Sequence, residues 1–299
     1  MVSTHPKCLQ DNKARRLATV SPSILDFHDS VAENEEAIRR ITRNFGAVHV
    51  DMMSPDFIPY RDETFQGDSI KRIYGVVDRS AIIDFHLMYM NPEKAIEKID
   101  GIVNPSGRSN VNITVHREAY CDDICDKNAF AAELNGALLG KNGSRKELEK
   151  ATKRLSKTIA YLKDAGYSVG MAFEPETGIF TLDDTLIGLS DETIGKLDLL
   201  LPMTVVSGKG GQVYMDDLGW KIEAASDKYD GRAMSGKKIQ VDGGIKDRNI
   251  YHPLSMGARD LVIGSYVTRP FLNGEENPGA NMLRISNLIN QFNGTTTYS

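Results

Sequence analysis

The sequence predicts an α/β protein, a (β/α)8 barrel in which eight parallel strands alternate with helices. Two observations carry this prediction: eight short apolar runs alternate with amphipathic segments, and polar residues collect where the runs end. The runs are almost continuously apolar, as strands buried on both faces should be. The expected strands are 17–25, 47–53, 81–88, 110–117, 167–175, 197–205, 238–244 and 260–267.

Helices are expected between most of these strands, because apolar residues recur there at helical spacing. Gly46 ends the first amphipathic segment, and Pro92 stands in the first turn of the third. Fewer than eight units would leave an open doubly wound sheet as the rival fold. The first strand is not followed by GxGxxG, so a dinucleotide site lacks its fingerprint. The expected helices are 30–46, 67–75, 91–99, 145–165, 181–195, 214–229, 247–257 and 280–293.

Composition narrows the class of protein. The chain has 299 residues, 40% of them hydrophobic, which is enough for a large core. Its net charge is −5 and its basic residues are scattered among acids, which argues against a nucleic-acid partner. We read neither a membrane span nor a secretory signal in it, and three cysteines, an odd number, fit a reducing compartment. We therefore expect a cytoplasmic protein with no membrane partner.

The predicted domain organisation is simple. Residues 1–16 are expected to form a polar N-terminal extension, and 17–299 a single barrel domain. An insertion near 118–144 follows the fourth strand, and the loop 54–66 follows the second. Both would lie at the C-terminal face of a barrel, where they could shape a site or serve as surface insertions or oligomer contacts. We also expect a homo-oligomer.

Four side chains that can bind metals stand at the ends of expected strands: His49, Asp51, His86 and Asp242. In a barrel these ends meet on one face, where catalytic groups gather. His49 and Asp51 are two residues apart, so an extended strand directs both to the same side. Mixed imidazole and carboxylate ligation suits Zn²⁺ or Fe²⁺ best, with Mn²⁺ or Co²⁺ also acceptable. The sequence therefore predicts one divalent metal site. His116 ends the fourth strand and could line the pocket or pack as an ordinary polar residue.

Glycine-rich turns follow the last three expected strands: SGKGGQ at 207–212, DGG at 242–244 and GS at 264–265. Backbone N–H groups in such turns form anion-binding nests, and barrels often bind phosphate after their last strands. Lys209 in the first turn could reach a phosphate, and Gly208 and Gly210 beside it are candidate substrate-binding residues. A small molecule with a phosphate group is the expected ligand.

Seven segments, in order and spanning 18–268, resemble the ribulose-phosphate 3-epimerase family. They are SPSIL, HVDMM with FIP just after it, FHLM, MAFEPET, LLLPMTV with GKGGQ, VDGGI and IGS. The resemblance implies a TIM barrel of the ribulose-phosphate-binding type. It also implies an isomerase of the EC 5.1.3 type that inverts carbon 3 of a ketose phosphate, typically interconverting D-ribulose 5-phosphate and D-xylulose 5-phosphate.

The likeness also implies roles for individual residues. The metal ligands would be His49, Asp51, His86 and Asp242. The two aspartates would also be the acid/base pair, because inversion needs one base on each face of a planar enediolate. A divalent metal supplies the electrophile that holds the enediolate charge. The residues lining the substrate would be Ser23, Met53, Met88 and Met203. The phosphate ligands would be Gly211, Gly243, Gly244, Gly264 and Ser265.

The chain departs from the family pattern beside the sugar rather than at the metal. Ser54 follows HVDMM where the family usually has an acidic or amide residue, and VSGKGGQ replaces NPGFGGQ. After the fourth strand, His116-Arg117-Glu118 replaces HPE. These departures leave the ketose phosphate open, with a hexulose phosphate such as allulose 6-phosphate as the alternative.

Two functions of other classes are alternatives. A phosphate-binding decarboxylase or aldolase can use the same scaffold, but the decarboxylases carry a D-x-K-x-x-D run, and HVDMMS contains no lysine. A non-catalytic phospho-sugar binder would be attractive if Asp51 or Asp242 had been lost. Both aspartates are present. The epimerase prediction therefore ranks first.

Overall fold

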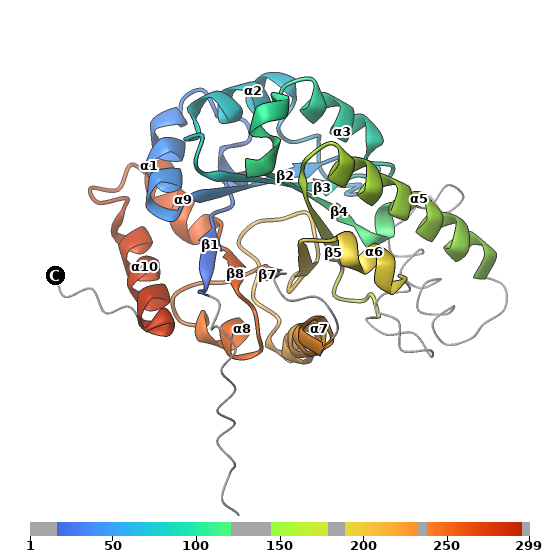
Figure 1. Ribbon diagram of the computed structural model, residues 1–299. Coiled ribbons are helices and arrows are strands. Elements are labelled where there is room, and N and C mark those ends of the chain that lie inside the picture. Colours follow the sequence, from blue (N-terminus) through green and yellow to red (C-terminus); the bar gives the residue numbers. More distant parts are fainter. Residues whose placement is uncertain (1–16, 121–144, 179–188, 232–237, 295–299) are drawn as a thin grey trace, which may run out of the picture.

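Eight parallel strands form a ring with helices around it (Figure 1). The structure is a computed structural model that describes residues 17–120, 145–178, 189–231 and 238–294. The strands are β1 Thr19–Ser21, β2 Ala47–Met53, β3 Ile82–Met88, β4 Val111–His116, β5 Ser168–Phe173, β6 Leu199–Pro202, β7 Lys238–Asp242 and β8 Asp260–Val262. The expected barrel is confirmed.

The strands pair in the order β1-β8-β7-β6-β5-β4-β3-β2, so β1 and β2 are the two ends of the sheet. A bridge between Ser23 and His49 joins these ends. The backbone N–H of His49 donates to the carbonyl of Pro22 at 2.8 Å, and the N–H of Ile24 donates to the carbonyl of His49 at 3.1 Å. These bonds close the ring directly beside the predicted metal site.

The helices form the outer layer of the barrel. They are α1 Glu35–Phe45, α2 Gly67–Val76, α3 Glu93–Asp100, α5 Arg145–Asp164, α6 Asp191–Lys196, α7 Gly219–Gly231, α8 Tyr251–Ser255, α9 Ser265–Leu272 and α10 Ala280–Asn293. Short 3-10 helices are η1 Leu25–Phe27, η2 Pro105–Asn110, η3 Arg117–Ala119 and η4 Asp216–Leu218. In Figure 1, α10 lies beside α1 and α9, and completes the helical layer outside β1. None of the helices in the described ranges has the length and apolarity that crossing a membrane requires.

The expected bounds of several elements were wrong, and among the strands the first and the eighth differ most from the structure. The run 17–25 forms strand only over Thr19–Ser21, because Pro22 has no N–H to donate to a ladder. The run 260–267 leaves the sheet after Val262, and α9 begins at Ser265. Its buried Val267 belongs to the inner face of this helix, and apolar content alone cannot separate such a face from a strand.

Some expected features fall outside the described residues. These are the N-terminal extension 1–16, residues 121–144 of the insertion near 118–144, and residues 179–188, which include much of the helix expected at 181–195.

Alternation along β3 and β4 divides apolar from polar side chains. Asp84 on β3 pairs in register with Asn112 on β4, and His86 pairs with Thr114. The side chains of Asp84, Asn112 and Thr114 are hydrogen-bonded to one another, whereas Phe85 between Asp84 and His86 joins the hydrophobic core. Period-two geometry therefore directs the polar set to one side of the sheet and the apolar set to the other.

Gly170 on β5 makes room for this packing. It pairs in register with Thr114, and a Cβ at Gly170 would collide with the Thr114 hydroxyl and lie 2.6 Å from Leu199 Cδ1. We predict that Gly170→Ala lowers the free energy of unfolding by about 1–3 kcal/mol through overpacking. Gly75→Ala is the matched control, because a Cβ on this helical glycine would meet no atom within 4 Å. It should raise stability by about 0.5–1 kcal/mol. Urea unfolding of both variants measures these changes, and a neutral Gly170→Ala would contradict this packing.

Candidate active site

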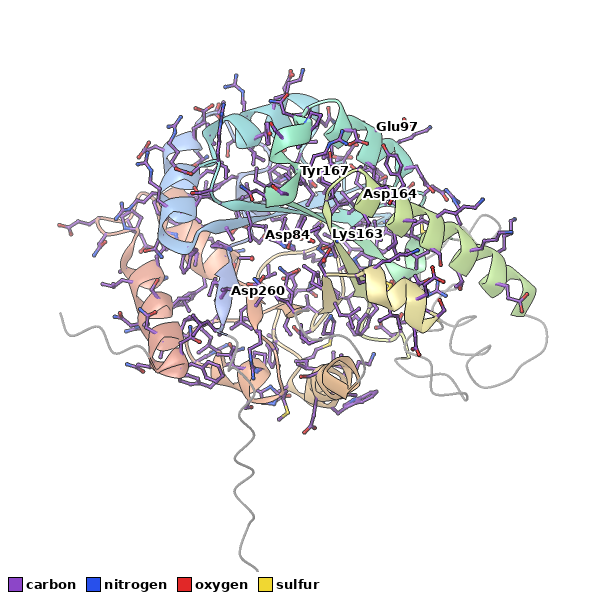
Figure 2. All side chains as sticks on the ribbon, viewed as in Figure 1. Asp84, Glu97, Lys163, Asp164, Tyr167 and Asp260 are labelled. Atoms are coloured by element: carbon purple, nitrogen blue, oxygen red, sulfur yellow. The ribbon has the colours of Figure 1, made fainter. Side chains whose placement is uncertain are left out.

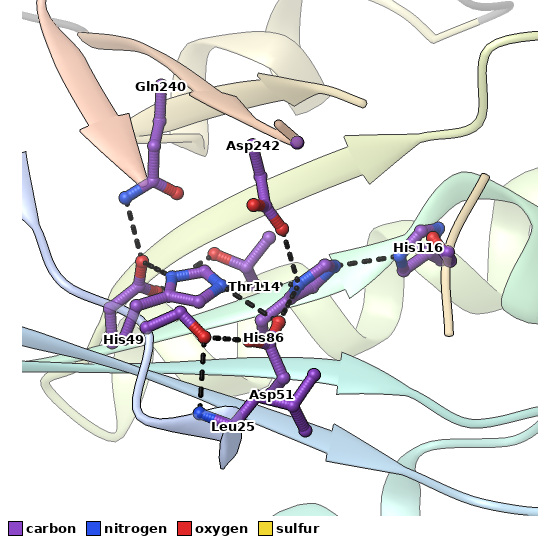
Figure 3. Close-up of polar contacts among 12 residues, drawn as sticks. Leu25, His49, Asp51, His86, Thr114, His116, Gln240 and Asp242 are labelled. Carbon is purple, nitrogen blue, oxygen red and sulfur yellow. Dashed lines mark hydrogen bonds and ion pairs between the residues drawn. The ribbon is translucent and has the colours of Figure 1, made fainter. Parts of the chain in front are cut away.

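Four side chains from three strands converge at the C-terminal end of the barrel (Figure 3). His49 and Asp51 come from β2, His86 from β3 and Asp242 from β7, and one ligand atom from each lies within 4.8 Å of the others. Asp51 Oδ1 is 3.2 Å from His49 Nε2 and 3.1 Å from His86 Nδ1, and these two nitrogens are 3.3 Å apart. Asp242 Oδ2 lies 4.0 Å from His86 Nδ1.

This donor set fits a divalent ion. Bonds from Zn²⁺ to imidazole or carboxylate are about 2.0–2.2 Å long, so neighbouring ligand atoms of one ion stand roughly 3–3.5 Å apart. The three separations among His49, Asp51 and His86 fall in this range. Two imidazoles and two carboxylates are also a set that Zn²⁺, Fe²⁺, Mn²⁺ and Co²⁺ accept. The four residues could therefore hold such an ion.

Each imidazole is held by its outer nitrogen. His49 Nδ1 lies 2.8 Å from Asp84 Oδ2, which leaves Nε2 directed at the cluster. His86 Nε2 lies 2.8 Å from His116 Nε2, which leaves Nδ1 directed at the cluster. Such outer partners fix the orientation and tautomer of a metal-binding histidine. Figure 3 shows the contact between His86 and His116.

Their surroundings give the two aspartates different pKa values. Burial disfavours the charge on Asp51, but the imidazoles of His49 and His86 outweigh this effect and lower the pKa of its carboxyl well below its usual range. Burial and the nearby Asp51 carboxylate raise the pKa of Asp242 to about 7. In the metal-free protein the pair therefore holds a proton on Asp242 near neutral pH, while Asp51 is ionised.

The pKa values of His49 and His86 also differ. Burial opposes protonation of His49, but Asp51 and Asp84 outweigh it and raise its pKa well above the usual value. Burial lowers the pKa of His86 to about 4, even though Asp51 lies beside it. His86 is therefore neutral at physiological pH, the form in which imidazole binds a metal.

A polar network lies below the cluster, inside the barrel. Gln240 Nε2 donates to Asp84 Oδ2 at 2.8 Å and to Asp260 Oδ2 at 3.0 Å. Asp84 and Asp260 are labelled in Figure 2, and both are at least 95% buried. Ser21 donates to Asp260 at 3.0 Å. Asp84 also contacts His49, so this network helps to hold the His49 imidazole in place from inside the barrel.

A pocket opens above the cluster. Asp51 and Asp242 line it, whereas His49 and His86 are fully buried beneath it. Met53, Met88 and Met203 contribute an apolar wall, and all three are at most 3% exposed. The other predicted substrate residues also line this pocket: Ser23, Gly208, Gly210, Gly211, Gly243, Gly244, Gly264 and Ser265.

The glycine turns bring backbone to the wall of this pocket. Gly243 and Gly244 have φ values of +126° and +67°, which L side chains rarely adopt. A Cβ on Gly243 would lie 2.6 Å from Val205 Cγ2, and one on Gly244 would collide with the Tyr214 backbone. Gly264 precedes the N-terminus of α9, where unpaired N–H groups favour anions.

Two loops meet at the pocket rim. The Tyr60 hydroxyl, from the loop after β2, donates to the Ser207 carbonyl at 3.0 Å. Arg61 Nη1 donates to the Gly208 carbonyl at 3.1 Å. Lys209 Nζ stands 5.4 Å from the centre of the Tyr60 ring. The expected proximity of the loop 54–66 to the site is thus observed, through contacts with the loop after β6.

A family comparison agrees with this geometry. Residues 19–128 and 146–268 match the ribulose-phosphate 3-epimerase family. The chain belongs to this family. It is accordingly an isomerase of the EC 5.1.3 type.

Relatives of known name support this assignment. The chain is 25% identical to ribulose-phosphate 3-epimerase 1 of Cupriavidus necator over 258 residues, which is 85% of this chain and 86% of the relative. It is 25% identical to ribulose-phosphate 3-epimerase of Escherichia coli K12 over 251 residues, 83% of this chain and 88% of the relative. Ribulose-phosphate 3-epimerase 2 of Cupriavidus necator is 32% identical over 120 residues, 39% of this chain and 46% of the relative.

Solved structures share the fold. A crystal structure of KGPDC from Streptococcus mutans in a ligand complex aligns with a TM-score of 0.54 and 7% identity. The alignment covers 92% of this chain and 99% of that one. At this identity the match concerns the barrel alone.

Sequence reasoning on this epimerase-family chain missed the outer partners of the histidines. The sequence leaves His116 open between pocket lining and packing, and the structure places it against His86 rather than among the pocket-lining residues. Asp84 and Glu118 were not among the predicted site residues. Each is two residues from a histidine along the chain, so polar alternation in an apolar strand was an available signal for Asp84.

The raised pKa of Asp242 predicts that the metal-free protein loses stability as pH rises. The folded carboxyl titrates at about 7 instead of 3.8, so the folded state binds the proton more tightly than the unfolded state. Stability should therefore fall as pH rises from about 4 to about 7. We predict that Asp242→Asn removes this loss and is more stable than the wild type at pH 8 by about 1 kcal/mol or more.

Denaturant unfolding of chelator-treated protein between pH 4 and pH 8 measures the difference. The advantage of Asp242→Asn should shrink toward pH 4, where the wild-type carboxyl is protonated in the folded state and about half protonated in the unfolded state. An advantage that is the same at both pH values would contradict the raised pKa.

Proposed function

We propose that this protein is a metal-dependent 3-epimerase of a ketose phosphate, with D-ribulose 5-phosphate and D-xylulose 5-phosphate as the leading substrate pair. The observation that carries the proposal is the placement of two carboxylates, Asp51 and Asp242, in one metal-capable cluster at the floor of one pocket. The family relationship supports the same reaction.

The strand order supports a two-base mechanism. Asp51 comes from β2 and Asp242 from β7, and β1 and β8 separate these strands in the ring. The two carboxylates thus reach the pocket from different strands rather than side by side. Inversion at a carbon α to a carbonyl needs one group to remove the proton and another to deliver one to the opposite face.

The protonation states suit this exchange. Two-base inversion needs one carboxylate ionised and the other protonated, and in the metal-free protein Asp51 is ionised while Asp242 holds the proton. Exchange of the two states serves the reverse reaction. Ser23 Oγ donates to Asp51 Oδ2 at 2.6 Å and so orients that carboxylate. When bound, the divalent ion would supply an electrophile that stabilises the negative charge of the enediolate.

The remaining pocket residues would bind the substrate and exclude water. Met53, Met88 and Met203 present thioether and methylene groups to a planar intermediate and keep solvent from its reactive carbon. The backbone N–H groups around Gly243 and Gly264, together with the start of α9, would hold the phosphate. Lys209 lines the pocket and belongs to the VSGKGGQ turn that replaces NPGFGGQ, so a hexulose phosphate is the alternative substrate. A homo-oligomeric state stays a prediction.

Substitution of either aspartate tests the two-base proposal. Asp51→Asn and Asp242→Asn should each lower kcat by about 10²–10⁴-fold, because an amide cannot exchange the proton. Circular dichroism should show the folded barrel in both variants. Asp247→Asn is the matched control, since Asp247 pairs with Arg284 at 2.9 Å and does not line the pocket. Near-normal epimerisation by either active-site variant would rule out the two-base assignment.

Metal removal tests the ion. Treatment with a chelator, followed by elemental analysis to verify the loss, should abolish epimerisation of D-ribulose 5-phosphate. Readdition of Zn²⁺, Fe²⁺, Mn²⁺ or Co²⁺, one at a time, should restore it and identify the preferred ion. Full activity in protein that is verifiably metal-free would remove the ion from the mechanism.

A panel of substrates tests the sugar. Pentulose and hexulose 5- and 6-phosphates should be compared by kcat/KM, with exchange of the C3 hydrogen as the readout. We expect D-ribulose 5-phosphate to give the highest value. A higher value for a hexulose 6-phosphate would transfer the assignment to that substrate, and exchange on none of them would favour a lyase or binding function.

A further inference from the structure

We propose that His116 and Glu118 are positioning residues that hold the outer nitrogen of His86 and so keep its Nδ1 free for the metal. The inference rests on the proposed function, because it concerns the same candidate metal site. His116 ends β4 and Glu118 lies in η3, and both are fully buried. Neither lines the pocket, so neither is expected to touch the substrate.

The contact between the two histidines has the geometry of a hydrogen bond. His86 Nε2 and His116 Nε2 are 2.8 Å apart, and the ring planes differ by only 15°. Nearly parallel planes allow an N–H of one ring to point along the lone pair of the other. The second contact continues outward, since His116 Nδ1 lies 3.3 Å from Glu118 Oε2.

One arrangement of protons satisfies both contacts and leaves His86 able to bind a metal. The ionised carboxylate of Glu118 only accepts, so His116 must carry its proton on Nδ1. With its only proton on Nδ1, His116 has a lone pair on Nε2, and the opposing Nε2 of His86 is then the donor. A neutral His86 with its proton on Nε2 has its lone pair on Nδ1, the atom directed at Asp51 and His49. The opposite tautomer would direct an N–H at the cluster and block ligation.

Glu118 is held in place from its other oxygen. Its Oε1 accepts from the backbone N–H of Glu174 at 3.1 Å and from the Thr177 hydroxyl. Lys221 Nζ donates to the Thr177 carbonyl at 2.7 Å and so fixes the loop that supplies these donors. The carboxylate is thus oriented before any metal binds, and Oε2 remains directed at His116.

His49 provides an internal comparison. Its outer nitrogen meets the carboxylate of Asp84 directly, at 2.8 Å. His86 has the same arrangement with one imidazole, His116, placed between ring and carboxylate. A common arrangement around both imidazole ligands points to a role in metal binding rather than to polar packing alone. Partners of this kind are typically worth 10–100-fold in metal affinity.

The structure offers a substitution that separates packing from hydrogen bonding. The ring of Phe57 packs against His116 with centroids 4.7 Å apart, so the site already accommodates aromatic contact. His116→Phe retains a ring of similar shape but has no acceptor for His86. His116→Gln restores an acceptor oxygen and serves as the rescue variant. Val115→Ala is the matched control, because Val115 is a fully buried apolar neighbour in the hydrophobic core.

The experiment is a Zn²⁺ competition titration against a chromogenic chelator, with full-length protein and unfolding measured in parallel. We expect His116→Phe to weaken Zn²⁺ binding about 10–100-fold, and His116→Gln to recover most of the loss. Val115→Ala should lose stability without losing Zn²⁺ affinity. Nitrogen-15 spectra of the Zn²⁺-loaded wild type should show the His86 proton on Nε2.

The outcomes separate this inference from the proposed function. If wild-type protein binds Zn²⁺ and His116→Phe binds it equally well, the positioning role is overturned while the metal site stands. A His86 proton on Nδ1 in the loaded wild type would also overturn it. If wild-type protein binds none of the four divalent ions, the metal site of the proposed function fails first. Equal losses of Zn²⁺ affinity in His116→Phe and Val115→Ala would mean that reduced stability causes both, and would overturn the positioning role of His116.

Discussion

Burial of the Asp51 carboxylate is the constraint that the surrounding site has to satisfy. Asp51 is 4% exposed, and a buried charge is expensive unless it is paired and hydrogen-bonded. Ser23, which follows β1, His49 on β2 and His86 on β3 contact its two oxygens. The bridge between Ser23 and His49 also closes the barrel, so ring closure and charge compensation occur at the same place. The fold therefore delivers a compensated carboxylate to the floor of a pocket.

Two unlike environments follow from this burial. Asp51 is surrounded by imidazoles and stays ionised, whereas Asp242 faces Asp51 and has a raised pKa. A pair of like groups separated in this way can hold one proton between them, as acid/base chemistry at neutral pH requires. The same cluster could hold a divalent ion, because the outer nitrogen of each histidine already has a partner and the inner nitrogen is directed at the cluster.

Much of the fold and the site could be predicted from the sequence, because both rest on short-range periodicity. Residues two apart on a strand share a face, so His49 and Asp51 had to point together, and strands of one barrel end at one face. The contact of His86 with His116 could not be read this way, since it depends on the register of β3 against β4. The hydrogen bond from Tyr60 to Ser207 joins residues 147 positions apart and left no local signal. The end of β8 was misplaced because Val267 is buried in a helix as it would be in a strand.

The central claim is that two carboxylates on different strands exchange protons with opposite faces of one carbon. The most direct test is a single-turnover reaction of D-ribulose 5-phosphate in D₂O, with the hydrogen at C3 of substrate and product analysed separately. The account predicts that the product carries deuterium at C3 from the first turnover, while unreacted substrate keeps protium. Product that retains the original protium would mean that one group removes and returns the same proton, and would contradict the account.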